Sequence, residues 1–70
     1  MATVSTIEGI VGRLTRHYAD AAFHGGHNDS GYWIAAADKG KRWAWERNGM
    51  VSPDAAFIFA RVMMDEFNGA

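Results

Sequence analysis

The segment GYWIAAADKGKRWAWER, residues 31–47, contains the strongest local signal for a β-hairpin in this sequence. Its centre, DKG at 38–40, fits a type I turn with Gly40 in the left-handed conformation, which glycine adopts without steric cost. This turn sets Ala37 opposite Lys41 and joins two segments whose side chains can alternate between two faces. We therefore predict a two-stranded antiparallel β-hairpin over about residues 31–47.

The register of this hairpin groups the tryptophans. Pairing Trp33 with Trp45 and Ala35 with Trp43 places all three indole rings on one face of the hairpin. We expect Trp33, Trp43 and Trp45 to belong to the structural core, because a chain this small needs its largest apolar side chains inside. A slip of one residue in the turn would leave the three rings unaligned.

The segment before the hairpin predicts a helix over about residues 6–23. Ser5 and Glu8 have the spacing of a capping box, in which each side chain satisfies a backbone amide of the first turn. Apolar side chains recur at three- and four-residue steps and form one stripe, so we expect Ile10 and Leu14 in the core. The glycines of HGGHNDS at 24–30 predict the end of the helix and a polar loop.

The segment after the hairpin predicts a second helix over about residues 53–67. Ser52 is a natural N-cap, and Pro53 suits the first helical position, where its missing N–H costs nothing. Asn68 and Gly69 are favoured C-cap residues. The predicted order is helix, strand, strand, helix, which is an α+β fold.

Composition limits the remaining possibilities. A chain of 70 residues has room for a single domain, over residues 1–70. Seven basic and eight acidic side chains give a net charge of −1. The whole protein therefore has no positive electrostatic potential that would attract a polyanion. The chain has no cysteine, no export signal at its N-terminus and no apolar run long enough to cross a membrane, so we expect a soluble, cytoplasmic protein with no membrane contact.

The second helix carries a wider apolar arc than one helix and one hairpin can cover. The predicted partner-interface residues are its large apolar side chains, Ile58, Phe59, Val62, Met63 and Phe67. Two-fold association is the commonest way to bury such a surface, so we expect a homodimer through this helix, aided by an unpaired edge of the hairpin. A self-associating structural subunit is one alternative function. The other reading of the arc is that the hairpin curls over it.

The basic residues of the hairpin offer a different kind of site. Single-strand binders stack bases on aromatic rings and bind phosphates with neighbouring cations, which here would be Lys39, Lys41, Arg42 and Arg47. The alternative function is then a small nucleic-acid-binding regulator. Because the net charge is not positive, nucleic acid is the less favoured partner.

The sequence gives only weak evidence for a metal site or a catalytic site. His24 and His27 are three residues apart, Asp29 follows them, and His17 precedes them. These four side chains are of types that could in principle coordinate a zinc ion. Two glycines separate the first pair and no thiol supports it, so we expect no functional metal and no cofactor. No Gly-rich phosphate loop, nucleophile elbow or paired carboxylate is evident, so we predict no catalytic residue and a protein that is not an enzyme.

These residues indicate a small, non-enzymatic protein-binding module. Its short length, its helix–hairpin–helix design and the stretch GYWIAAADKGKRWAWERNG at 31–49 resemble the small phage-encoded inhibitors of host defence, anti-CRISPR proteins among them. The resemblance is one of class and transfers no binding residue. It implies a mode of action, which is to occupy a surface of a host protein complex and block it. Many such inhibitors mimic DNA with dense acidic surfaces, whereas this near-neutral sequence fits blocking by shape and apolar contact.

Overall fold

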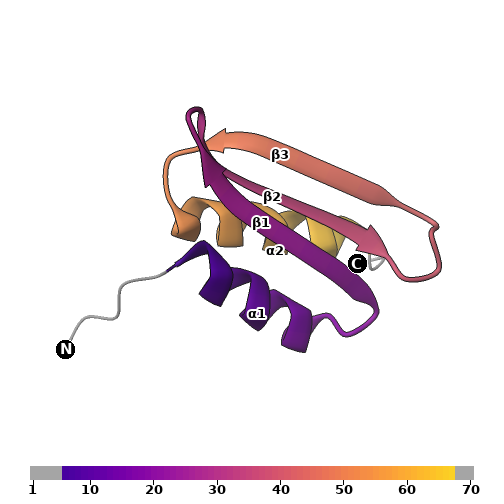
Figure 1. The fold of residues 1–70 in the computed structure, drawn as a ribbon. Coiled ribbons are helices and arrows are strands. Elements are labelled where there is room, and N and C mark those ends of the chain that lie inside the picture. The colour runs from indigo at the N-terminus through magenta and orange to yellow at the C-terminus, as the bar shows by residue number, and fades with distance from the viewer. Residues whose placement is uncertain (1–5, 68–70) are drawn as a thin grey trace.

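The computed structural model describes residues 6–67, which form two helices and three strands (Figure 1). The elements in chain order are α1 Ile7–His17, β1 Ala21–Asn28, β2 Gly31–Asp38, β3 Ala44–Met50 and α2 Pro53–Phe67. The strands form one antiparallel sheet in the order β1-β2-β3, so each strand pairs with its neighbour in sequence. The protein has an α+β fold.

The predicted two-stranded hairpin is wrong, because residues 21–28 form a third strand beside β2. The sequence pattern predicts a helix as far as residue 23 and a loop after it, whereas α1 ends at His17 and β1 pairs with β2 along its whole length. Gly25 explains part of the difference. A Cβ at Gly25 would lie 2.9 Å from Val11 Cγ2, so this glycine lets α1 pack closely on β1 and does not end a helix.

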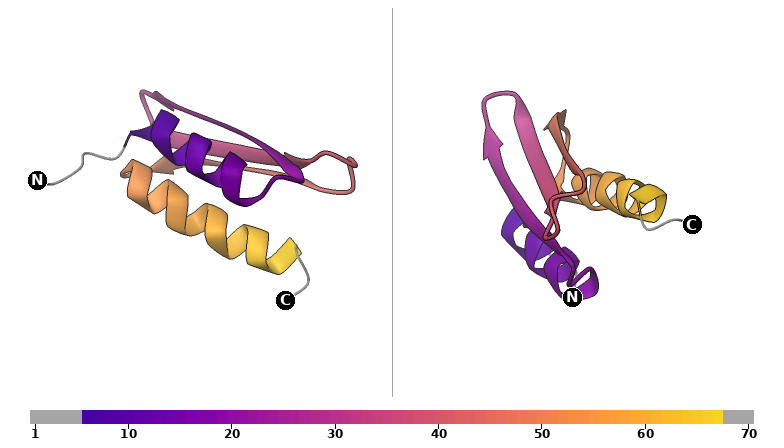
Figure 2. Two further views of the ribbon diagram at one scale, coloured as in Figure 1. Left: turned by 90° about the horizontal axis from the view of Figure 1, so that it is seen from below. Right: turned by 90° about the vertical axis from the view of Figure 1, so that its right-hand side faces the viewer.

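Both helices cover the same face of the sheet and leave the opposite face open (Figure 2). The core between the helices and the sheet consists of these buried side chains: Ile7, Ile10, Leu14, Ala21, Phe23, Ile34, Ala36, Ala56, Ala60 and Met64. Ile10 and Leu14, which belong to the apolar stripe of α1, are 1% and 0% exposed. The core is therefore built by one stripe from each helix and by every second residue of β1 and β2.

Side-chain caps start both helices. Thr6 is the N-cap of α1, and its hydroxyl accepts a hydrogen bond from Gly9 N at 2.9 Å. Ser5 of the predicted capping box lies outside the described residues. Ser52 caps α2, where its hydroxyl accepts from Ala55 N at 3.1 Å.

The C-cap residues predicted for α2, Asn68 and Gly69, lie outside the described residues. Within residues 6–67, neither helix combines the length and the apolar character that a membrane crossing requires. Each helix instead has one buried stripe and one exposed side, as in a helix that packs on a sheet.

The connection between β2 and β3 differs from the predicted turn. The strands are joined by residues 39–43, and Asp38 N donates to Trp43 O at 3.0 Å to close the loop. Lys41 has a φ of 61° and occupies the left-handed position that the sequence pattern predicts for Gly40. This wider connection shifts the register of β3 against β2.

The shifted register separates the tryptophans, so the predicted single indole face is wrong. Trp45 lies opposite Ala36 on the face that the helices cover. Trp33 points to the open face, where a Cβ at Gly26 would lie 2.7 Å from its Nε1. Trp43 precedes β3 and belongs to the connection. All three rings are half-buried, and none is among the fully buried core residues.

An ion pair holds this connection in place. Asp38 is 4% exposed, and its carboxylate accepts hydrogen bonds from Arg42 Nε at 2.8 Å, from Arg42 Nη2 at 3.0 Å and from Arg42 N at 3.2 Å. The bonds from the Arg42 side chain lower the pKa of Asp38 from 3.8 to about 2, against the opposing effect of burial. The ionised form of Asp38 therefore stabilises the folded protein.

Asp38→Asn is expected to lower the melting temperature at pH 7, because the amide keeps the shape of the side chain but loses the charge that Arg42 binds. A carboxylate with a lowered pKa stabilises the fold above its unfolded pKa, and this contribution disappears as the pH falls through the folded value. The difference between parent and variant should thus shrink from pH 3.8 toward pH 2. Melts followed by circular dichroism between pH 7 and 2 measure it. Asp29→Asn, at an exposed turn, is the control, and a constant difference for Asp38→Asn would contradict the assigned role.

Candidate binding surfaces

The outer face of α2 presents part of the predicted interface to solvent. Ile58 is 63% exposed and Val62 is 57% exposed, one helical turn apart. Phe59 and Met63 are half-buried, and the Phe59 ring meets the Trp45 ring edge-on at 5.5 Å between centroids. The exposed apolar arc is thus narrower than the sequence predicts, and we call the pair Ile58 and Val62 the α2 ridge.

Phe67 also contributes to the fold. It is 41% exposed, and its ring stacks on Trp43 with 4.8 Å between centroids and 7° between planes. This contact ties the end of α2 to the residue that precedes β3. Of the five predicted interface residues, the two of the α2 ridge remain the most exposed.

Carboxylates border the α2 ridge on both sides. At about 100° per residue, Asp54 and Asp65 lie on one side of the ridge and Glu66 lies on the other. All three are exposed, and none forms an ion pair with another of residues 6–67. Val51, which is 90% exposed, adds an apolar side chain just before the helix. Arg61 lies on the same side as Asp54 and Asp65, so the apolar strip has a rim of three carboxylates and one guanidinium, which we call the acidic rim.

The hairpin residues considered for nucleic acid are dispersed. Lys39 and Lys41 are exposed in the β2–β3 connection, Arg42 binds Asp38, and the Arg47 guanidinium carbon lies 5.4 Å from the centroid of the Phe59 ring. The tryptophans that would stack on bases lie on different surfaces. The structure therefore does not bring these four cations and all three indole rings to one surface.

The histidines are also separated. His24 and His27 lie in β1, an odd number of residues apart, so their side chains point to opposite faces of the sheet. His27 packs on Tyr32 with 4.7 Å between ring centroids, whereas His24 is exposed on the open face. Among the described residues, no group of three or more His, Cys, Asp or Glu side chains could hold a metal ion.

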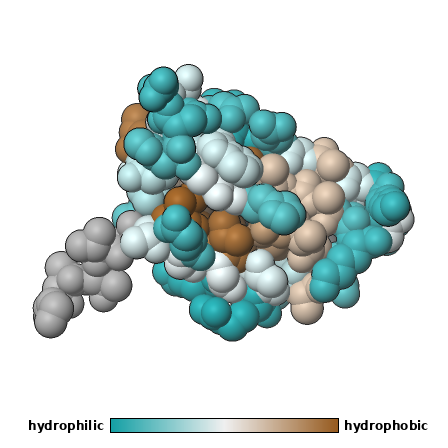
Figure 3. Space-filling model, viewed as in Figure 1, coloured by the Kyte–Doolittle hydropathy of each residue, from teal (hydrophilic) through white to brown (hydrophobic). Residues whose placement is uncertain are grey.

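Alanine side chains cover part of the open face of the sheet. A shallow depression of about 440 Å³ lies over it. Its lining residues are Ala22, His24, Ala35, Ala36, Ala37, Ala44, Trp45 and Glu46. Figure 3 shows weakly apolar side chains, in pale brown, over the right-hand part of the view, with hydrophilic side chains around them. A two-stranded prediction could not reveal this surface, because β1 supplies one side of it.

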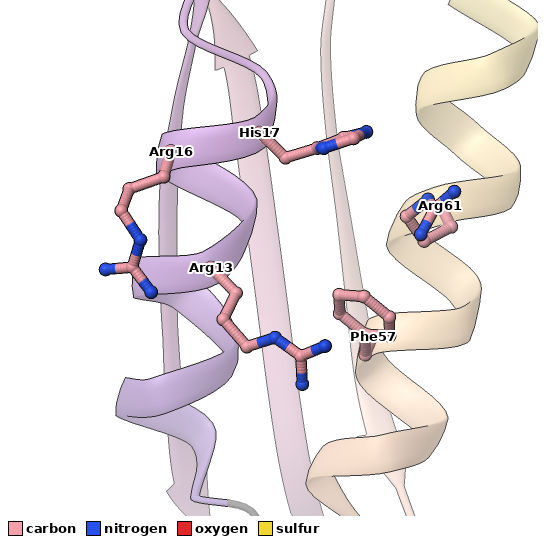
Figure 4. A pocket seen from close by; sticks show the side chains of 5 residues that line it. All are labelled: Arg13, Arg16, His17, Phe57 and Arg61. Carbon is pink, nitrogen blue, oxygen red and sulfur yellow. The ribbon is translucent and has the colours of Figure 1, made fainter.

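A groove of about 350 Å³ runs between the two helices (Figure 4). It is lined by Arg13, Arg16 and His17 of α1 and by Phe57 and Arg61 of α2. The guanidinium carbons of Arg13 and Arg61 lie 4.8 Å and 5.7 Å from the centroid of the Phe57 ring. In Figure 4, Arg13 and His17 reach from α1 toward α2, whereas Arg16 points away from it.

The sequence contains no direct signal for this groove. Arg13 and Arg61 come from opposite ends of the chain, and the packing of α1 beside α2 brings them to one aromatic ring. No protein-family model, curated protein or solved structure matches the chain.

Proposed function

We propose that this protein is a non-enzymatic protein-binding module that docks the outer face of α2 into a groove on its partner. The observation that carries the proposal is the α2 ridge, two large apolar side chains one turn apart and each more than half exposed. Amphipathic helices bind apolar grooves through side chains at this spacing. Burying Ile58 and Val62 against a partner would remove their apolar surface from water, which favours binding.

The acidic rim specifies the chemistry of the partner. A groove that receives the α2 ridge would place Lys or Arg side chains opposite Asp54, Asp65 and Glu66. The homodimer predicted from the sequence would use the same ridge. An antiparallel two-fold contact centred on the ridge would, however, set Asp54 of one copy near Asp65 of the other, and such like charges repel. The charge pattern thus favours a foreign partner with a basic rim.

The more specific part of the proposal is that the partner is a host protein complex and that binding blocks it in the host cytoplasm. This part comes from the class resemblance of the sequence to phage-encoded inhibitors of the anti-CRISPR type. The acidic rim supports it, because surfaces rimmed by Lys and Arg are typical of nucleic-acid-binding proteins. A helix with this rim would compete with nucleic acid for such a surface.

The double substitution Ile58→Lys with Val62→Lys is expected to abolish partner binding without unfolding the protein. Both positions are exposed, lysine is a good helix former, and the added charges oppose a basic rim. Tagged parent and variant are used to capture proteins from host extract, and the captured complex is then assayed for inhibition with purified components. We expect one complex that the parent retains and inhibits and that the variant does not bind.

The matched control is Asp29→Asn with Glu46→Gln, which changes the net charge by the same amount at exposed sites away from α2. This control should retain the complex. Light scattering gives the mass of parent and variants in solution. A dimeric mass that becomes monomeric in the Ile58/Val62 variant would assign the ridge to a second copy and contradict the foreign partner.

A further inference from the structure

The groove between α1 and α2 has a charge unlike that of the whole molecule. Three of the seven basic residues of the chain line it, and none of the eight acidic residues does. Within residues 6–67, no carboxylate lies in ion-pair contact with Arg13, Arg16 or Arg61. A groove lined by one sign of charge concentrates counter-ions even when the net charge of the protein is −1.

Phe57 positions two of these arginines before any ligand binds. The guanidiniums of Arg13 and Arg61 both lie within cation–π distance of its ring, at 4.8 Å and 5.7 Å. Each guanidinium keeps its N–H groups for another partner, because a cation–π contact uses the ring face and no hydrogen-bond acceptor. Two cations that share one ring repel each other, and an anion bound between them removes this repulsion.

The donors of the groove suit an anion with several oxygens. Guanidinium presents a planar set of N–H groups that matches the oxygens of phosphate, often through two parallel hydrogen bonds. His17 points from α1 toward α2 and adds a third nitrogen-bearing side chain (Figure 4). The volume of about 350 Å³ lies at the lower end of the range for small-molecule sites.

We propose that the groove formed by Arg13, His17, Phe57 and Arg61 binds a phosphate group, carried by a nucleotide or by the backbone of a nucleic acid. Arg16, on the outer side of α1, extends the positive surface along which a longer ligand would pass. The Phe57 ring already holds two guanidiniums, so it does not serve as a stacking surface for a base. Binding should therefore depend on salt and be nearly independent of base sequence.

The site is distinct from the α2 ridge, because Phe57 lies on the α1 side of α2 and Arg61 lies between Phe57 and the ridge. It also differs from the hairpin site predicted from the sequence. The two tests use different substitutions, so either proposal can fail without the other.

Arg13→Gln with Arg61→Gln is expected to weaken phosphate binding by about 10-fold or more, which corresponds to losing about 1.4 kcal/mol or more of binding free energy. Calorimetry with inorganic phosphate and with adenosine diphosphate tests the small ligands. Fluorescence anisotropy with a labelled 20-nucleotide strand, alone and as a duplex, tests the backbone. For a strand, the slope of log K against log salt should also fall by roughly two when both arginines are replaced.

Two further variants separate this site from general charge and from misfolding. Lys39→Gln with Lys41→Gln removes the same charge at the β2–β3 connection and should change affinity by less than about threefold. Phe57→Leu keeps every charge and most of the apolar contact. It should weaken binding because Arg13 and Arg61 lose the cation–π contacts that position their guanidinium groups. Circular dichroism checks that each variant is folded.

The response of the ligands identifies the source of the phosphate. Binding of phosphate and nucleotide alone indicates a single-group site, whereas binding only of the strands indicates a backbone site, and either result supports the proposal if it depends on Arg13 and Arg61. The proposal is overturned if no probe binds the parent, or if the arginine and lysine variants lose affinity equally.

Discussion

Ile34→Ala should lower the free energy of unfolding by about 2–5 kcal/mol. Ile34 is 0% exposed and lies in β2, the central strand, beneath the helices. Truncation removes buried methyl and methylene groups and leaves a cavity that the close-packed neighbours cannot fill. A domain of this size has a total stability of roughly 4–10 kcal/mol, so the variant would lose a large part of it. Urea unfolding followed by tryptophan fluorescence measures the change.

Ile58→Ala is the matched control, because it removes the same atoms from an exposed position. Ile58 is 63% exposed, and alanine is the stronger helix former, so the free energy of unfolding should change by less than about 0.5 kcal/mol. Equal losses of stability in the two variants would show that Ile34 is not a core residue. The same Ile58 variant also shows whether the α2 ridge contributes to stability in the absence of a partner.

Gly31→Ala is expected to destabilise the protein by roughly 2–4 kcal/mol, through backbone strain and overpacking. Gly31 has a φ of 121°, a conformation that residues with a Cβ rarely adopt. A Cβ at this position would lie 2.6 Å from Met50 O, which is backbone of β3 and cannot rotate away. The substitution therefore has to displace the end of β3 or the turn between β1 and β2. Thermal and urea unfolding should both record the loss.

Gly12→Ala makes the same chemical change where the structure has room for it. A Cβ at Gly12 would meet only the end of the flexible Arg16 side chain at 3.5 Å, which is an ordinary contact. Alanine is favoured over glycine in a helix, so the variant should be more stable than the parent by about 0.5–1 kcal/mol. The two substitutions should thus act in opposite directions. A neutral Gly31→Ala would contradict the close approach of Gly31 to β3.

The α+β class and the positions of the helix starts could be predicted from the sequence, because the signals that mark them are local. Ser52 and Pro53 mark the beginning of α2 within two residues of chain. The stripe that contains Ile10 and Leu14 repeats within three turns of α1. The exposed α2 ridge also belongs to an apolar arc that is visible in the sequence. None of these features requires knowledge of a distant residue.

The third strand, the strand register and the groove depend on contacts between elements that are distant in the sequence. β1 forms because its backbone pairs with β2 and because Gly25, which has no Cβ, allows α1 to pack closely on the strand. Both reasons involve contacts with other elements. The pair Asp38 and Arg42 selects a longer β2–β3 connection than the DKG turn, and a change of register moves side chains to the other face of a strand. Arg13 and Arg61 meet at one ring through helix packing alone. Local patterns cannot predict such contacts, because their free energy comes from residues far apart in the chain.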